Sequence, residues 1–149
     1  MKKVSILFLS LLFTISCSDN NPTEPEDHFQ PEGWVFINGA SQRFMQIFQG
    51  KFSVGSDTLF TVPNGENTDH ISIKFLDSKG IEIDPPTDKD KKLSWDIMDT
   101  TIVWLERHDD EEWEFHLEGK KTGETEIQFY IMHNGHSDVR SGYIKVKVQ

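Results

Sequence analysis

The sequence predicts an all-β fold, an antiparallel β-sandwich, and three observations support this prediction. Apolar and polar residues alternate in short runs, for example at 71–75 and 113–117, and this period of two is typical of strands with one buried face. The runs recur at roughly 8–12-residue spacing, which is typical of two packed sheets. After residue 32, no stretch places its apolar residues at helical spacing, so helices are not expected.

The expected strands of the first half begin with a wholly apolar run, which is followed by a less regular apolar stretch. Ser72 and Lys74 alternate with the apolar residues of the third strand, and a turn sequence at 77–80 ends it. Pro85 and Pro86 stop the fourth strand. In chain order, these strands are expected at 34–37, 44–48, 71–75 and 81–83.

A charged loop at 87–92 separates the two halves, and alternation is clearest after it. Glu114, His116 and Glu118 are interleaved with large apolar residues, as are Gln128 and the residues that follow it. Period two therefore gives each of these strands one apolar and one polar face. The remaining strands are expected at 93–97, 102–104, 113–117, 127–131 and 144–148.

The last third of the chain resembles the bacterial immunoglobulin-like domain of the group 2 type. The motifs that carry the resemblance are Leu-Ser-Trp-Asp at 93–96, Asp-Thr-Thr-Ile-Val at 99–103, Gly119, Gly-Glu-Thr-Glu-Ile at 123–127 and Ile-Lys-Val-Lys-Val at 144–148. The resemblance implies an immunoglobulin-like antiparallel β-sandwich. Residues 33–149 have the length of one domain, although domains of this family are usually shorter. Domains of this kind usually act as spacers or binding modules, so the resemblance implies no catalysis.

The N-terminus has the features of an export signal. Two lysines precede an apolar run at 4–15, which is too short to span a bilayer, and a serine lies before Cys17. Residues 14–17 (Thr-Ile-Ser-Cys) resemble a bacterial lipobox, in which the signal is removed and the cysteine is lipidated. The resemblance implies a signal peptide at 1–16 and a lipid on Cys17. The alternative is an ordinary secretory signal.

Residues 17–32 are predicted to be a disordered tether between the lipid and the domain. Polar residues dominate this stretch, and Phe29 is its one large apolar residue, so it cannot bury enough surface to fold alone. Acidic residues soon after Cys17 resemble a signal that sends some lipoproteins to the cell surface. We therefore expect an outer-membrane lipoprotein that faces either the periplasm or the surface. Cys17 is the only cysteine, which excludes a disulfide within the domain.

The charge of the chain limits its partners. It has 25 acidic and 15 basic residues and a formal net charge of −10, and removal of the signal takes away two more lysines. Nucleic acid is therefore excluded as a partner. Anionic lipid should also repel the domain, so the membrane is expected as a partner only through the lipid anchor. A metal ion, a protein and a glycan remain as candidate partners.

The tetrapeptide at 133–136 (His-Asn-Gly-His) predicts a hairpin with two facing imidazoles. Asn-Gly between two β runs favours a type I′ turn, so His133 and His136 should pair and lie on one face. Period two then places Asp138 on that face, opposite Ile131. Two imidazoles and a carboxylate at a rigid turn suit zinc, iron, copper or nickel. The alternatives are a solvated turn without a ligand and a pH-sensitive contact.

Two further histidines are candidates for completing this metal site. His116 should face outward from its strand, between two glutamates, and His28 lies in the tether. His108 lies in a charged run that is typical of a solvated loop, and His70 precedes a strand without an evident partner. We expect one of the first two to be the fourth ligand.

The sequence therefore favours a non-catalytic binding module on a membrane anchor. It contains no nucleophile elbow, phosphate loop, metalloprotease helix motif or candidate thiol nucleophile. Capture or transfer of a transition metal through the histidine hairpin is the leading hypothesis. The alternative is a structural or adhesive module that binds a protein or a glycan without metal. Trp104 should face outward beside Val103, which would suit the alternative.

Overall fold

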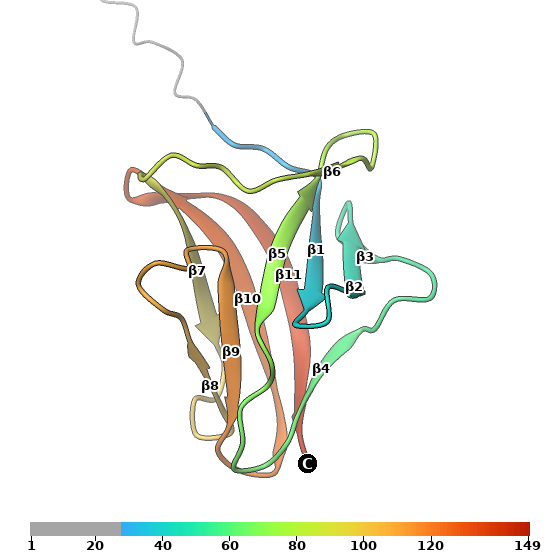
Figure 1. Ribbon diagram of the computed structural model, residues 1–149, viewed down its shortest axis with the longest axis vertical. Helices are drawn as coiled ribbons and strands as arrows, with labels where there is room; N and C mark the ends of the chain where they lie inside the picture. Colours follow the sequence, from blue (N-terminus) through green and yellow to red (C-terminus); the bar gives the residue numbers. More distant parts are fainter. Residues whose placement is uncertain (1–27) are drawn as a thin grey trace, which may run out of the picture.

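The protein is a β-sandwich, which confirms the predicted all-β fold class. The structure, a computed structural model, describes residues 28–149 (Figure 1). The predicted signal peptide, Cys17 and the tether up to residue 27 lie outside the described residues. The strands are β1 (Gly33–Asn38), β2 (Arg43–Phe48), β3 (Lys51–Phe52), β4 (Leu59–Val62), β5 (Ile71–Leu76), β6 (Glu82–Ile83), β7 (Lys91–Ile97), β8 (Val103–Glu106), β9 (Glu114–Gly119), β10 (Gly123–His133) and β11 (His136–Val148).

Two sheets form the layers of the sandwich. The larger sheet has the order β3-β2-β1-β5-β9-β8, with β6 paired to β5, and the smaller one has the order β4-β11-β10-β7. All pairings are antiparallel except that of β4 with β11, which is parallel. The sequence predicted neither this pairing nor β4 itself. Within residues 28–149, no helix is long and apolar enough to cross a membrane.

The core lies between the sheets and is rich in aromatic rings. Phe129, on β10 of the smaller sheet, is fully buried. Its ring centroid lies 4.9 Å from that of Phe115 and 5.4 Å from that of Phe36, and Trp34 and Phe60 complete the contacts at 6.4 and 6.2 Å. Alternate residues of β10 are buried, as period two predicts. Among residues 28–149, all strands and all buried apolar residues lie within 33–148, so we expect a chain that begins at residue 19 to retain this fold.

The described end of the tether packs on the sandwich. The ring of Phe29 lies 5.1 Å from that of Phe75, in an edge-to-face arrangement, and the Glu32 amide donates a hydrogen bond to the carbonyl of Leu76. Burial of the Phe29 ring provides the driving force for this packing. Residues 28–32, with which the coloured part of the ribbon in Figure 1 begins, therefore lie on the domain.

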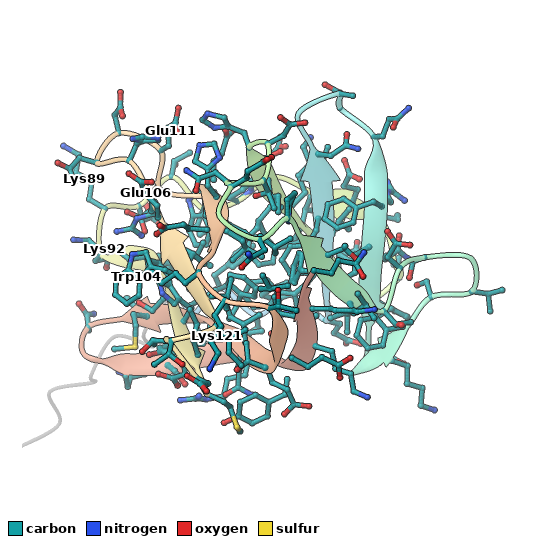
Figure 2. All side chains as sticks on the ribbon, turned by 90° about the horizontal axis from the view of Figure 1, so that it is seen from below. Lys89, Lys92, Trp104, Glu106, Glu111 and Lys121 are labelled. Carbon is teal, nitrogen blue, oxygen red and sulfur yellow. The ribbon has the colours of Figure 1, made fainter. Side chains whose placement is uncertain are left out.

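Trp104 faces outward from the edge strand β8, as expected from its position beside the buried Val103. Its side chain is 44% exposed, and the Lys120 ammonium lies 4.8 Å from the centre of its ring. Figure 2 shows Trp104 at the rim of the molecule, on the same strand as Glu106. A cation above an indole ring stabilises this arrangement.

Candidate metal site

The β10–β11 hairpin has the turn that its sequence predicts. Asn134 and Gly135 both have positive φ, at 47° and 87°, as a type I′ turn requires. His133 is the last residue of β10 and pairs with His136, the first residue of β11. The prediction that these two histidines close the turn is therefore confirmed.

Asp138 has a different strand position from the one predicted. Ile131 pairs with Val139 and Met132 pairs with Ser137, so Asp138 is the extra residue of a β-bulge and does not lie opposite Ile131. A bulge places two residues against one and redirects a side chain, which simple alternation cannot anticipate. The carboxylate of Asp138 is 1% exposed, so the bulge holds it inside the hairpin end.

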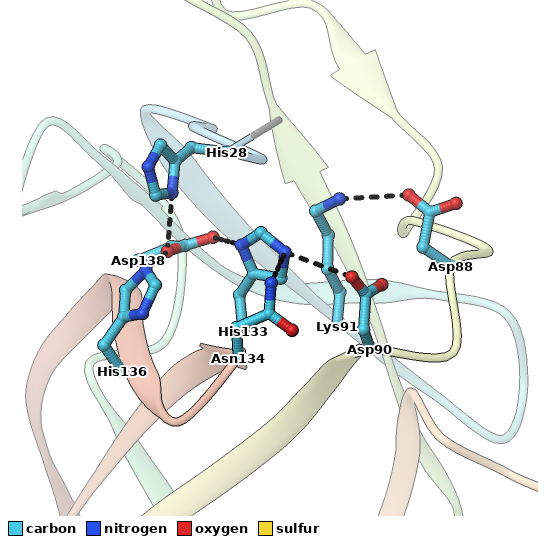
Figure 3. A network of polar contacts seen from close by, with 8 residues as sticks. All are labelled: His28, Asp88, Asp90, Lys91, His133, Asn134, His136 and Asp138. Atoms are coloured by element: carbon cyan, nitrogen blue, oxygen red, sulfur yellow. Dashed lines mark hydrogen bonds and ion pairs between the residues drawn. The ribbon is translucent and has the colours of Figure 1, made fainter. Parts of the chain in front are cut away.

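Three imidazoles surround this carboxylate (Figure 3). Asp138 Oδ2 lies 3.5 Å from His133 Nδ1. Its other oxygen, Oδ1, lies 3.3 Å from His136 Nε2 and 3.0 Å from His28 Nδ1. One ligand atom from each of the four residues lies within 4.8 Å of the others. The structure thus brings together four of the five predicted ligands, with His28 as the completing residue.

These separations fit a four-coordinate ion. Zinc binds imidazole nitrogen and carboxylate oxygen at about 2.0–2.1 Å, so neighbouring ligand atoms of a tetrahedral site lie about 3.3 Å apart. The contacts of Asp138 with the three imidazoles, two through Oδ1 and one through Oδ2, are 3.0–3.5 Å long and bracket this value, and one ligand atom of each residue lies within 4.8 Å of the others. His133 Nδ1 and Asp138 Oδ2 are also buried without a hydrogen-bond partner among the described residues. A buried nitrogen and oxygen at ligand spacing are the groups that a bound cation would satisfy.

A second carboxylate orients the His133 ring. His133 Nε2 lies 3.1 Å from Asp90 Oδ2, and because a carboxylate accepts only, Nε2 carries the proton and Nδ1 presents its lone pair. The amide nitrogen of Asn134 lies 3.1 Å from the same Nε2, but it can donate only to the other tautomer. The charged acceptor forms the stronger bond. A carboxylate behind a ligand histidine is a usual support of a metal site.

The sequence did not single out Asp90, because its role depends on strand order. Asp90 directly precedes β7, and β7 pairs with β10 so that Lys91 lies opposite His133. Lys91 is itself almost fully buried, and its ammonium lies 3.0 Å from Asp88 Oδ2. Asp88 thereby balances the one lysine charge that Figure 3 shows beside the site.

His116 does not belong to this site, so the expectation that it could complete the ligand set is wrong. It lies on β9 of the larger sheet, whereas the hairpin belongs to the smaller sheet. His116 instead forms a group with His70 and His108 in which the ligand atoms lie within 4.8 Å of one another. The six histidines of the chain are thus divided into two groups of three.

Comparison with known proteins finds no matching family model and no curated protein of significant sequence similarity. The resemblance to bacterial immunoglobulin-like domains therefore stays a prediction, and what is shown is an all-β sandwich with a cluster of His28, His133, His136 and Asp138 at the β10–β11 hairpin, called the hairpin site below.

Proposed function

We propose that this chain is an exported, lipid-anchored outer-membrane protein that binds a transition-metal ion at the hairpin site and captures or hands on that ion outside the cytoplasm. The ligands would be His28, His133, His136 and Asp138. The observation that carries the proposal is the buried Asp138 carboxylate, which faces three imidazoles at the spacing of metal ligands.

The donor set favours zinc among the candidate ions. Three imidazole nitrogens and one carboxylate oxygen suit a tetrahedral Zn²⁺ ion, and copper, nickel and iron accept the same donors in other geometries. Four protein ligands fill a tetrahedron, whereas catalytic zinc sites keep one position for water. The ligand count therefore supports binding and transfer of the ion and argues against metal-assisted hydrolysis.

Two of the four proposed ligands are exposed to solvent and two are buried, and this arrangement suits reversible binding of an ion. The side chains of His28 and His136 are 34% and 45% exposed, whereas those of His133 and Asp138 are buried. His28 also lines a cavity of about 320 Å³ between the tether end and the loop before β7. An ion can thus reach two of the ligands from solvent.

Calorimetric titration of the metal-stripped soluble form, residues 19–149, with Zn²⁺ tests the proposal. We expect the protein to bind one equivalent of Zn²⁺ tightly at the hairpin site. The variant His133→Ala/His136→Ala should lose this equivalent, because it lacks two of the four proposed ligands. Spectra of ¹⁵N-labelled imidazoles should show His28, His133 and His136 shifting together. The heat should vary with the ionisation enthalpy of the buffer, since metal displaces protons from its ligands.

A matched control carries the same two changes in the other histidine group. The variant His108→Ala/His116→Ala should still bind Zn²⁺ at the hairpin site, and the ¹⁵N signals of His28, His133 and His136 should still shift when Zn²⁺ is added. Binding that is the same in the wild type and in His133→Ala/His136→Ala would contradict the proposal.

The turn itself should contribute to affinity. Gly135→Ala places a Cβ at a φ of 87° without any contact within 4 Å, so its direct cost should be about 1–2 kcal/mol of backbone strain. We expect weaker Zn²⁺ binding as well, because the turn sets the separation of His133 and His136. Gly55→Ala is the matched control, with a φ of 82° and equally open surroundings. It should show the same loss in urea unfolding and unchanged Zn²⁺ affinity.

A second candidate function rests on Trp104, whose exposed ring on an edge strand suits stacking on a sugar or packing against a protein. An adhesive module of this kind needs no metal. Absence of stoichiometric Zn²⁺ binding in the titration above would favour this candidate.

A further inference from the structure

We propose a second transition-metal site on the larger sheet, formed by His70, His108 and His116. This site is independent of the hairpin site and lies beyond the proposed function. His70 directly precedes β5, His108 lies in the loop between β8 and β9, and His116 lies on β9. The topology brings them together, since β5 and β9 are neighbours in the sheet.

The three rings converge closely. The ring centroid of His116 lies 4.0 Å from that of His70 and 5.6 Å from that of His108, and those of His70 and His108 lie 6.0 Å apart. One nitrogen of each lies within 4.8 Å of the others. Three imidazole ligands with a fourth position open to water or a carboxylate suit zinc, and also cobalt, nickel or copper.

The backbone fixes the tautomer of His116. Its Nδ1 lies 2.9 Å from the carbonyl oxygen of Thr68, and because a carbonyl only accepts, Nδ1 must donate and Nε2 presents a lone pair. Thr68 is itself held by β9, since its hydroxyl accepts from the Leu117 amide and its own amide donates to the Leu117 carbonyl. His116 is therefore oriented as a metal ligand before any ion binds.

Two carboxylates lie beside His70. Glu111 and Glu114 each place Oε2 3.6 Å from His70 Nδ1, an ion-pair distance at which their negative charge attracts a cation to this ring. Backbone hydrogen bonds shape the loop, from the Glu111 amide to the His108 carbonyl and from the Glu114 amide to the Glu111 carbonyl. Figure 2 shows Glu111 at the outer rim of the molecule.

The cluster is accessible to an ion from solvent. The side chain of His70 is 46% exposed and also lines a cavity of about 740 Å³, whose wall includes Asp69, Ile71 and the first three residues of β4. Acidic side chains beside the rings lower the electrostatic cost of bringing a divalent cation to this face.

The test uses Zn²⁺ with the soluble form in which the hairpin site is already removed by His133→Ala/His136→Ala. We expect one remaining equivalent, which the further change His108→Ala/His116→Ala abolishes. Loading with Co²⁺ should give the visible absorption of a tetrahedral or five-coordinate nitrogen site. Glu111→Gln/Glu114→Gln should weaken Zn²⁺ binding by roughly 10–100-fold, the usual effect of outer-shell substitutions.

The matched control for the carboxylates is Glu124→Gln/Glu126→Gln on β10, which should leave Zn²⁺ binding unchanged. Circular dichroism and urea unfolding should show that each variant is folded. A hairpin-deficient protein that binds no stoichiometric Zn²⁺, including one whose cluster responds to protons alone, would overturn this inference. That result leaves the hairpin proposal intact, because the hairpin site is tested in the His108→Ala/His116→Ala background.

Discussion

Replacing Asp138 by asparagine is expected to abolish tight Zn²⁺ binding at the hairpin. Asp138 is the proposed ligand that contacts all three imidazoles, and its negative charge is the one that a bound ion would meet inside the site. Asparagine keeps the shape and removes the charge. The loss should exceed the roughly 10–100-fold that an outer-shell substitution causes. The fold should survive, because a neutral amide is easier to bury than a carboxylate.

Two further carboxylates provide a graded comparison in the same titration. Asp90→Asn changes the group that orients His133 and should weaken Zn²⁺ binding by roughly 10–100-fold. Glu124→Gln, at the opposite end of β10, should have no effect. Thermal unfolding of the metal-free proteins checks that each variant is folded. Equal affinity of wild type and Asp138→Asn would show that the carboxylate is not a ligand.

Phe129→Ala is expected to lower the free energy of unfolding by about 3–5 kcal/mol, the usual range for a buried phenylalanine. Its ring contacts those of Trp34, Phe36, Phe60 and Phe115 from both sheets, so no neighbour can move into the cavity without losing its own packing. The total free energy of unfolding of a domain of this size is about 5–15 kcal/mol. The variant should therefore be close to unfolding, as measured with urea.

Val54→Ala is the control for this measurement. Val54 is fully exposed in the loop after β3, and substitutions at such positions usually change stability by less than about 0.5 kcal/mol. A loss below about 1 kcal/mol for Phe129→Ala would mean that the centre of the sandwich is more loosely packed than its ring contacts indicate.

Much of the fold could be predicted because the alternation of apolar and polar residues in a strand corresponds directly to its buried and exposed positions. Strands such as β9 and β10 present one apolar face to the other sheet, and period two is visible in their sequences. Residues 59–62, which form β4, also alternate, with Phe60 and Val62 buried, but four residues of which three are apolar are too short a run to show period two in the sequence. Their parallel pairing with β11 joins distant parts of the chain, and local patterns do not encode such a pairing.

The hairpin site was predictable to the extent that it is local. Asn134-Gly135 determines the turn, and the turn determines that His133 faces His136. The position of Asp138 depends on a bulge, and that of His28 depends on the burial of Phe29 against Phe75. The grouping of His116 with His70 follows from the neighbouring positions of β5 and β9. The last two features require long-range packing, whereas the bulge is local but breaks the strict alternation on which the prediction was based.

The uneven burial of the hairpin ligands has a kinetic consequence. An ion held by four buried side chains leaves only when the fold opens, so its release is as slow as local unfolding. In the proposed site, the two solvent-facing imidazoles would dissociate one at a time, while His133 and Asp138 would keep the ion in place. An acceptor can then supply its own ligands stepwise, so the rate of exchange would depend on the acceptor's concentration and not on the stability of the sandwich.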